Sequence, residues 1–107
     1  MGLVFLKCIS VFNRKQLYKK KIKYTDFCMG ISRSGHLDKN ALLSIFKRIP
    51  EGTTEIVCHP GFSDESMTFY NHWHYNWQDE LAALVSPTIK KYISDHKIEI
   101  INFKDLS

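Results

Sequence analysis

Residues 55–61 read Glu55-Ile56-Val57-Cys58-His59-Pro60-Gly61. A short apolar strand runs here into a histidine and then into Pro-Gly, a pair that favours a chain turn. The pattern predicts an imidazole held at the carboxyl end of a buried strand. In parallel α/β sheets and barrels, the loops at those strand ends build the functional site. Because histidine titrates near neutral pH, His59 is a candidate proton carrier; the alternative is a histidine that only satisfies a loop carbonyl.

The composition is that of a globular protein. Hydrophobic residues make up 44% and charged residues 24% of the chain, which argues against intrinsic disorder. The 107 residues fit one domain at most. The apolar opening at residues 2–6 is far shorter than the roughly 20 residues of a membrane span, and no signal-peptide cleavage site follows it. We therefore expect a cytoplasmic protein with no membrane partner.

The three cysteines are Cys8, Cys28 and Cys58, an odd number without Cys-x-x-Cys spacing. Each lies inside an apolar run. Cysteines in such surroundings usually behave as small buried hydrophobic residues. The sequence therefore predicts buried, reduced thiols rather than a disulfide framework or a zinc site.

Hydrophobic periodicity predicts helices and strands that alternate along the chain. Residues 3–20 are predicted to be helical because apolar side chains recur there at helical spacing, although the β-branched start also suits a strand. Asp38 is the expected N-cap of a second helix, and Ser86 is the expected cap of a helix that has Pro87 at its first position. The remaining expected elements are strands at 24–29, 53–58 and 98–103 and helices at 38–48 and 78–85.

The order β-α-β-α-β predicts an α/β fold with parallel strands and right-handed crossovers. Three strands leave two open sheet edges and much apolar surface without a cover. We therefore interpret residues 1–107 as a single partial domain, which another segment or subunit completes.

Two groups of side chains in the loop after His59 have both a functional and a structural interpretation. On a strand, His72 and His74 would share one face, as metal ligands do, but no third ligand has a matching spacing, and a surface or substrate-facing loop is favoured. The aromatic residues would stack on a sugar ring or pin the loop down as a local cluster. They are Phe69, Tyr70, Trp73, Tyr75 and Trp77.

Charged residues also allow two interpretations. The basic run at residues 14–23 would bind nucleic acid by displacing counterions, but no recognition motif accompanies it, so a solvated helix face is favoured. Asp26 and Asp64 lie near predicted strand ends, where a carboxylate can reach a site. For Asp26 the alternative is an acceptor of hydrogen bonds in a turn.

Four stretches of the chain resemble one known family, in the family's own order. The similarity is good over residues 24–106 and weak over residues 1–23, and the Cys-His-Pro-Gly motif is its most specific part. The stretches are Thr25-Asp26-Phe27 with Gly30; Ser34-Gly35-His36-Leu37 with the Leu42–Ile49 helix and residues 50–55; Val57-Cys58-His59-Pro60-Gly61; and Glu80-Leu81 with Leu84 and residues 97–106.

These motifs resemble the C-terminal part of the YdjC-like carbohydrate deacetylases, a group that includes the chitooligosaccharide deacetylase ChbG and the hopanoid-associated HpnK. The resemblance implies a TIM-barrel-like fold and hydrolysis of N-acetyl groups on amino sugars or oligosaccharides. It implies a divalent metal, magnesium or zinc, which would polarise the acetyl carbonyl and activate a water. The family's metal ligands come from an Asp-Asp pair and a His-rich run, and neither occurs in this sequence.

On this resemblance His59 is predicted to be catalytic, as the group that hands a proton to the departing amine. Asp26, Pro60, Gly61 and Trp73 are predicted to contact substrate, and no metal ligand is assigned. We expect a C-terminal fragment or split subunit that works with the missing N-terminal half or as a homo-oligomer. The alternatives are a non-catalytic remnant or binding module of the same fold and, less favoured, a small nucleic-acid-binding domain.

Overall fold

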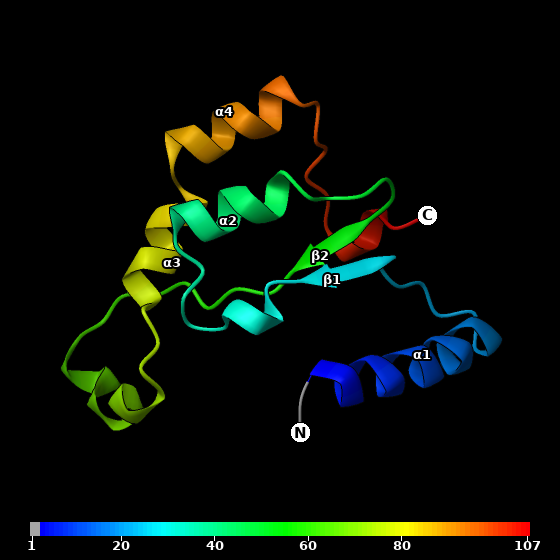
Figure 1. Ribbon diagram of the computed structural model, residues 1–107, viewed down its shortest axis with the longest axis horizontal. Coiled ribbons are helices and arrows are strands. Elements are labelled where there is room, and N and C mark those ends of the chain that lie inside the picture. The colour runs from blue at the N-terminus through cyan, green and yellow to red at the C-terminus, as the bar shows by residue number, and fades with distance from the viewer. Residues whose placement is uncertain (1–2) are drawn as a thin grey trace. The chain divides into compact units, whose positions relative to one another are not determined.

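The computed structural model describes the backbone of residues 3–107 and the side chains of residues 10–107. Helices and strands alternate along the chain, and short 3-10 helices interrupt its connecting segments (Figure 1). No helix among the described residues is long and apolar enough to cross a bilayer. The elements are α1 (Leu3–Lys19), β1 (Phe27–Met29), η1 (Ile31–Arg33), α2 (Lys39–Phe46), β2 (Thr54–Ile56), η2 (Glu65–Trp73), α3 (Trp77–Leu84), α4 (Pro87–Asp95) and η3 (Phe103–Asp105).

The chain divides into two compact units. One combines the segment up to Thr25, which contains α1, with Ile100–Ser107. Within it, the Lys23 ammonium donates a hydrogen bond of 2.9 Å to the carbonyl of Leu106. The other unit is Asp26–Glu99, and it contains both strands, the remaining α-helices and His59. The helix α1 confirms the helix predicted at residues 3–20. The candidate site around His59 belongs to the second unit.

The two strands form a parallel sheet, as the alternation of elements predicts (Figure 1). Phe27 pairs with Thr54 and Met29 pairs with Ile56. The ladder extends one residue beyond β2, because the Val57 N–H donates to the Met29 carbonyl at 2.9 Å. Each strand has three residues, fewer than predicted: β1 is the second half of the predicted strand at 24–29, and β2 lies within the predicted strand at 53–58.

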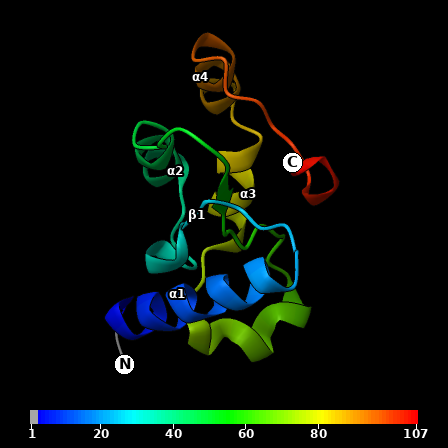
Figure 2. The same cartoon turned by 90° about the vertical axis from the view of Figure 1, so that its right-hand side faces the viewer.

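The core of this unit lies where α2 packs against α3 and α4. Asp38 caps α2 as predicted, because its Oδ1 accepts a hydrogen bond of 2.8 Å from the Ala41 N–H. In both views α3 lies between η2 and α4 (Figures 1 and 2). The helices bury their apolar faces in one cluster, which consists of Leu37, Leu42, Ile45, Phe46, Ala83 and Ile89.

Three local predictions are wrong. The apolar run at 98–103 does not form a third strand, and its end enters η3 instead, because strand propensity without a pairing partner gives no hydrogen-bonded ladder. Residues 57–64 run on without a turn at Pro60-Gly61, since the Gly61 N–H is held by the carbonyl of Trp77 at 3.1 Å. Proline does occupy the start of α4, but the Ser86 side chain makes no capping hydrogen bond.

The prediction of buried cysteines is also wrong where it can be checked. Cys28 is exposed, because β1 lies at an open edge of a two-stranded sheet, and Cys58 is only partly buried. Both are free thiols, as predicted. The side chain of Cys8 lies outside the described residues.

Gly30 lies where the chain leaving β1 passes close to the chain leaving β2. Its φ of 95° is in the left-handed region, and a Cβ there would lie 2.5 Å from the Val57 carbonyl oxygen. We expect Gly30→Ala to lower the free energy of unfolding by at least about 1 kcal/mol, the cost of left-handed backbone alone. Urea denaturation followed by circular dichroism measures it. Gly61→Ala is the matched control, since its Cβ would make an ordinary 3.7 Å contact; equal losses in the two variants would contradict the prediction.

Candidate functional site

The segment after β2 carries His59 along the carboxyl end of the sheet, where α3 holds it. The strand ends at Ile56, and His59 follows three residues later. Its backbone N–H donates a hydrogen bond of 2.9 Å to Oε1 of Glu80. The Trp77 carbonyl accepts from Gly61 two residues further on. Two contacts from one helix therefore fix the backbone on both sides of Pro60.

The His59 ring is half-buried between aromatic side chains. Its centroid lies 5.0 Å from that of Tyr75 and 6.4 Å from that of Trp77, both in edge-on arrangements. The Nδ1 atom is enclosed and has no hydrogen-bond partner, whereas Nε2 is not among the enclosed unpartnered atoms. A substrate therefore cannot reach the ring through Nδ1.

Gly35 positions the Tyr75 ring against which His59 packs. A Cβ at Gly35 would lie 2.3 Å from an atom of the Tyr75 ring, so only glycine leaves room for this ring. The Gly35 carbonyl also accepts a hydrogen bond of 2.7 Å from the Asn76 N–H. The loop before α2 therefore forms one wall of the His59 environment.

A continuous series of aromatic contacts runs from His59 into η2. We call it the aromatic ladder: Trp77, Tyr75, Trp73, Tyr70 and Phe69. Neighbouring rings are 5.0–5.8 Å apart between centroids and lie edge-on or tilted. The three outer rings are exposed, Trp73 to 48%, Tyr70 to 38% and Phe69 to 77%, whereas Tyr75 and Trp77 are half-buried. Exposed aromatic faces that lead to a histidine suit a ligand with apolar ring faces and polar edges, as in a sugar.

The aromatic ladder rests on a capped 3-10 helix. Asp64 is the N-cap of η2, and its carboxylate accepts hydrogen bonds from both the hydroxyl and the N–H of Ser66. These hydrogen bonds, the hydroxyl one foremost, lower the pKa of Asp64. Asp64 thus caps η2, a role that was not predicted for it from the sequence.

Asp26 lies at the other end of the sheet from His59. It comes directly before β1, and its carboxylate accepts hydrogen bonds from the N–H of Thr53 at 2.8 Å and from its hydroxyl at 2.9 Å. Because the strands are parallel, this clasp is at their amino ends, whereas His59 follows their carboxyl ends. Pro60, Gly61 and Trp73, by contrast, lie near His59 or on its aromatic ladder. The substrate contacts predicted for these four residues stay predictions.

The described histidines do not form a metal site. His72 lies in η2, where its Nδ1 is 2.9 Å from the Phe69 carbonyl oxygen, and His74 follows with a left-handed backbone. They are therefore not on the strand that a shared face would require. Among residues whose side chains are described, no group of three His, Cys, Asp or Glu could hold a metal ion. The divalent metal implied by the sequence resemblance does not fit these residues.

The two described cysteines are poor nucleophiles. Although Cys28 is exposed overall, partial desolvation of its thiol raises its pKa, and the charge of Glu55 and the 3.6 Å hydrogen bond to that carboxylate raise it further. Burial and the charge of Glu80 raise the pKa of Cys58. The raised pKa values keep both thiols protonated near neutral pH. Since the thiolate is the reactive form, neither cysteine is a good nucleophile there.

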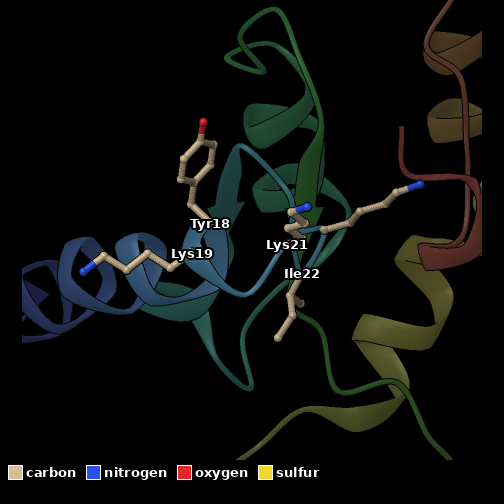
Figure 3. A pocket seen from close by; sticks show the side chains of 5 residues that line it. Tyr18, Lys19, Lys21 and Ile22 are labelled. Carbon is tan, nitrogen blue, oxygen red and sulfur yellow. The ribbon is translucent and has the colours of Figure 1, made fainter.

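In the basic run at residues 14–23, every side chain except the half-buried Leu17 is exposed. Exposure is common to a solvated face and to a nucleic-acid-binding face, so the favoured solvated face stays a prediction. A hollow lies at the end of α1, lined by Tyr18, Lys19, Lys21, Ile22 and Lys23. The labelled side chains point away from one another rather than converging on a ligand (Figure 3). The hollow belongs to the first unit, so it is no part of the His59 site.

Sequence analysis assigned no role to Glu80, the residue that holds His59. Glu80 is 1% exposed and lies on the buried face of α3 together with Ala83. The available signal was its spacing: a glutamate three residues before a core alanine, on the inward face of a predicted helix. Because a carboxylate is rarely buried without a partner, a glutamate at this inward position indicates a contact with a hydrogen-bond donor.

These features define an α/β protein whose candidate site lies at the carboxyl end of a parallel strand. Within that class the chain belongs to the YdjC-like protein family, whose model matches residues 2–95. The family resemblance drawn from the Cys-His-Pro-Gly motif is therefore confirmed.

Three relatives of the chain are named carbohydrate deacetylase. The protein from Thermoanaerobacter pseudethanolicus is 27% identical over 88% of this chain and 38% of its own length. That from Clostridium beijerinckii is 36% identical over 49% of this chain and 21% of its own length, and that from Geobacillus stearothermophilus is 27% identical over 64% and 29%. The chain thus spans well under half the length of the curated relatives it matches. No solved structure matches it.

The Cys28 thiol offers a test of the electrostatics on β1. Removing the Glu55 charge lowers the pKa of Cys28 toward its ordinary value, which raises the thiolate fraction at any pH below that pKa. We therefore expect Glu55→Gln to speed alkylation of Cys28 by iodoacetamide at neutral pH, measured by mass spectrometry of the peptide that contains it. Glu51→Gln, an exposed carboxylate nearby in sequence, is the control and should leave the rate unchanged. A Cys28 rate that is equal in both variants would rule out the Glu55 effect.

Proposed function

We propose that this chain forms part of a metal-dependent carbohydrate deacetylase and supplies its proton-transferring histidine, His59. The observation that carries the proposal is the placement of the half-buried imidazole beyond the carboxyl end of β2, with Nδ1 enclosed. Sites of parallel α/β folds lie at those strand ends. The names of the three relatives support deacetylation of a carbohydrate. We propose, from the motif resemblance, that the reaction is hydrolysis of an N-acetyl group on an amino sugar or oligosaccharide.

His59 would act at Nε2 in this reaction. Hydrolysis of an amide needs a proton on the departing nitrogen, and an imidazole delivers one efficiently near neutral pH. The contacts from α3 hold the backbone on both sides of Pro60 and so restrict where the His59 ring can lie. The metal that the family resemblance implies would need ligands outside this set of residues, and we route no step through it.

The sheet supports completion by further strands, in a TIM-barrel-like arrangement. The Phe27 N–H donates to Thr53 and the Met29 carbonyl accepts from Val57, so the backbone groups of Cys28 between them face away from β2. Phe27 is also 43% exposed, although strands of a parallel sheet are normally covered on both faces. The remaining part of the deacetylase fold, from the same or another polypeptide, would cover this edge.

His59→Ala tests the catalytic role. The chain is combined with magnesium or zinc and with the part of the Thermoanaerobacter pseudethanolicus relative that lies outside the match, and acetate release from an N-acetylated chitooligosaccharide is measured. We expect His59→Ala to reduce the rate roughly 100- to 10,000-fold, the usual contribution of general acid–base catalysis.

His96→Ala is the control for this experiment, because His96 stacks on Tyr92 beyond the end of α4 and does not contact His59. Its rate should match that of the unchanged chain. Equal rates for the two histidine variants would remove His59 from the reaction. Absence of acetate release from the unchanged mixture would instead favour a non-catalytic binding module.

Trp73→Ala tests the sugar-binding role of the aromatic ladder. Trp73 is half-exposed and contacts Tyr70, Tyr75 and Trp77. We expect the substitution to weaken binding of the same oligosaccharide roughly 2- to 10-fold, because an aromatic pair contributes about 0.5–1.5 kcal/mol beyond its buried area. Isothermal titration calorimetry measures the affinity. Phe103→Ala, an exposed aromatic residue of the other unit, is the control, and an equal effect there would contradict a specific subsite.

A further inference from the structure

Only one of the two carboxylate oxygens of Glu80 has a hydrogen-bond partner, and the side chain is buried. The residue is 1% exposed. Its Oε1 accepts the His59 N–H at 2.9 Å, whereas Oε2 is enclosed and has no partner. Buried polar atoms are almost always hydrogen-bonded in folded proteins, so an orphaned carboxylate oxygen requires an explanation.

A second orphan belongs to the residue that Glu80 already holds. Nδ1 of His59 is likewise enclosed without a partner. Both atoms belong to residues that one hydrogen bond of 2.9 Å already joins. Their chemistry is complementary, since an ionised carboxylate oxygen only accepts, and an imidazole nitrogen can donate.

We propose that Glu80 is the positioning residue of His59: its Oε2 accepts a hydrogen bond from Nδ1–H, while its Oε1 holds the backbone N–H of the same residue. A small rotation of either side chain between the Tyr75 and Trp77 rings closes the contact and satisfies both orphans.

The consequence concerns which ring nitrogen carries the proton. A carboxylate beside Nδ1 fixes the neutral ring in the Nδ1–H tautomer, and Nε2 keeps its lone pair. Nε2 then takes up and gives back a proton, and the adjacent carboxylate stabilises the imidazolium while that proton is bound. This role rests on the proposed function of His59, but the tautomer itself does not depend on any substrate.

The test reads the tautomer directly by ¹⁵N NMR of the histidine side chains in the full chain. Spectra are recorded about two pH units above the ordinary imidazole pKa of about 6.5, where the ring is neutral. His59→Gln assigns the His59 signals by their loss. In the unchanged protein we expect the proton on Nδ1. A ring with its proton on Nε2, or an even mixture of the two forms, overturns the proposal without any variant of Glu80.

Glu80→Gln supplies the sharper result, because the amide keeps an oxygen for the His59 N–H and places a donor where Oε2 was. The donor requires an acceptor, so the proton should move from Nδ1 to Nε2. Asp79→Asn removes the same charge one residue away on the exposed side of α3 and should leave the tautomer unchanged. A contact that only braces the backbone would leave the tautomer unchanged in both variants, which would overturn the proposal.

The outcome is separable from that of the proposed function. Loss of deacetylation with the Nδ1–H tautomer present would refute the enzyme and leave the positioning role. Full deacetylation with the Nε2–H tautomer would refute the positioning role alone.

Discussion

A carboxylate holds each end of the β2 segment, and the candidate site depends on that constraint. At the amino end Asp26 accepts two hydrogen bonds from Thr53, and at the carboxyl end Glu80 accepts one from His59. A one-residue slip of the strand would break both contacts and move every side chain to the opposite face of the sheet. The register of a three-residue strand is thus set by side chains outside it, because so short a ladder contributes little by itself.

The His59 environment is assembled from three segments that are distant in sequence. The strand delivers the ring, α3 clasps its backbone through Glu80, and the loop at Gly35 leaves room for Tyr75 beside it. Each contact involves a backbone group or a glycine. The backbone contacts therefore fix where the ring lies, as the proposed proton transfer by His59 requires.

Local signals in the sequence predict most of the helices and the parallel sheet. Asp38 and the apolar spacing of α2 specify that helix without tertiary information, and the alternation of elements implies parallel pairing. The apolar run at 98–103 fails because a strand exists only with a partner, which periodicity does not reveal. Glu80 was missed for a similar reason. The helix pattern shows that it faces inward, but it does not show that the backbone N–H of His59 lies within hydrogen-bonding distance.

Both tryptophans of the chain lie in the aromatic ladder, with ring centroids 6.2 Å apart, and the apolar core around α2 contains neither. Tryptophan fluorescence therefore reports on the aromatic ladder rather than on the apolar core around α2. Heat or denaturant that detaches η2 will change the spectrum while the helices remain folded, since regions with few buried contacts open before the core. Melting curves from tryptophan fluorescence and from far-ultraviolet circular dichroism will then differ in midpoint, and the difference measures how independently the aromatic ladder comes apart.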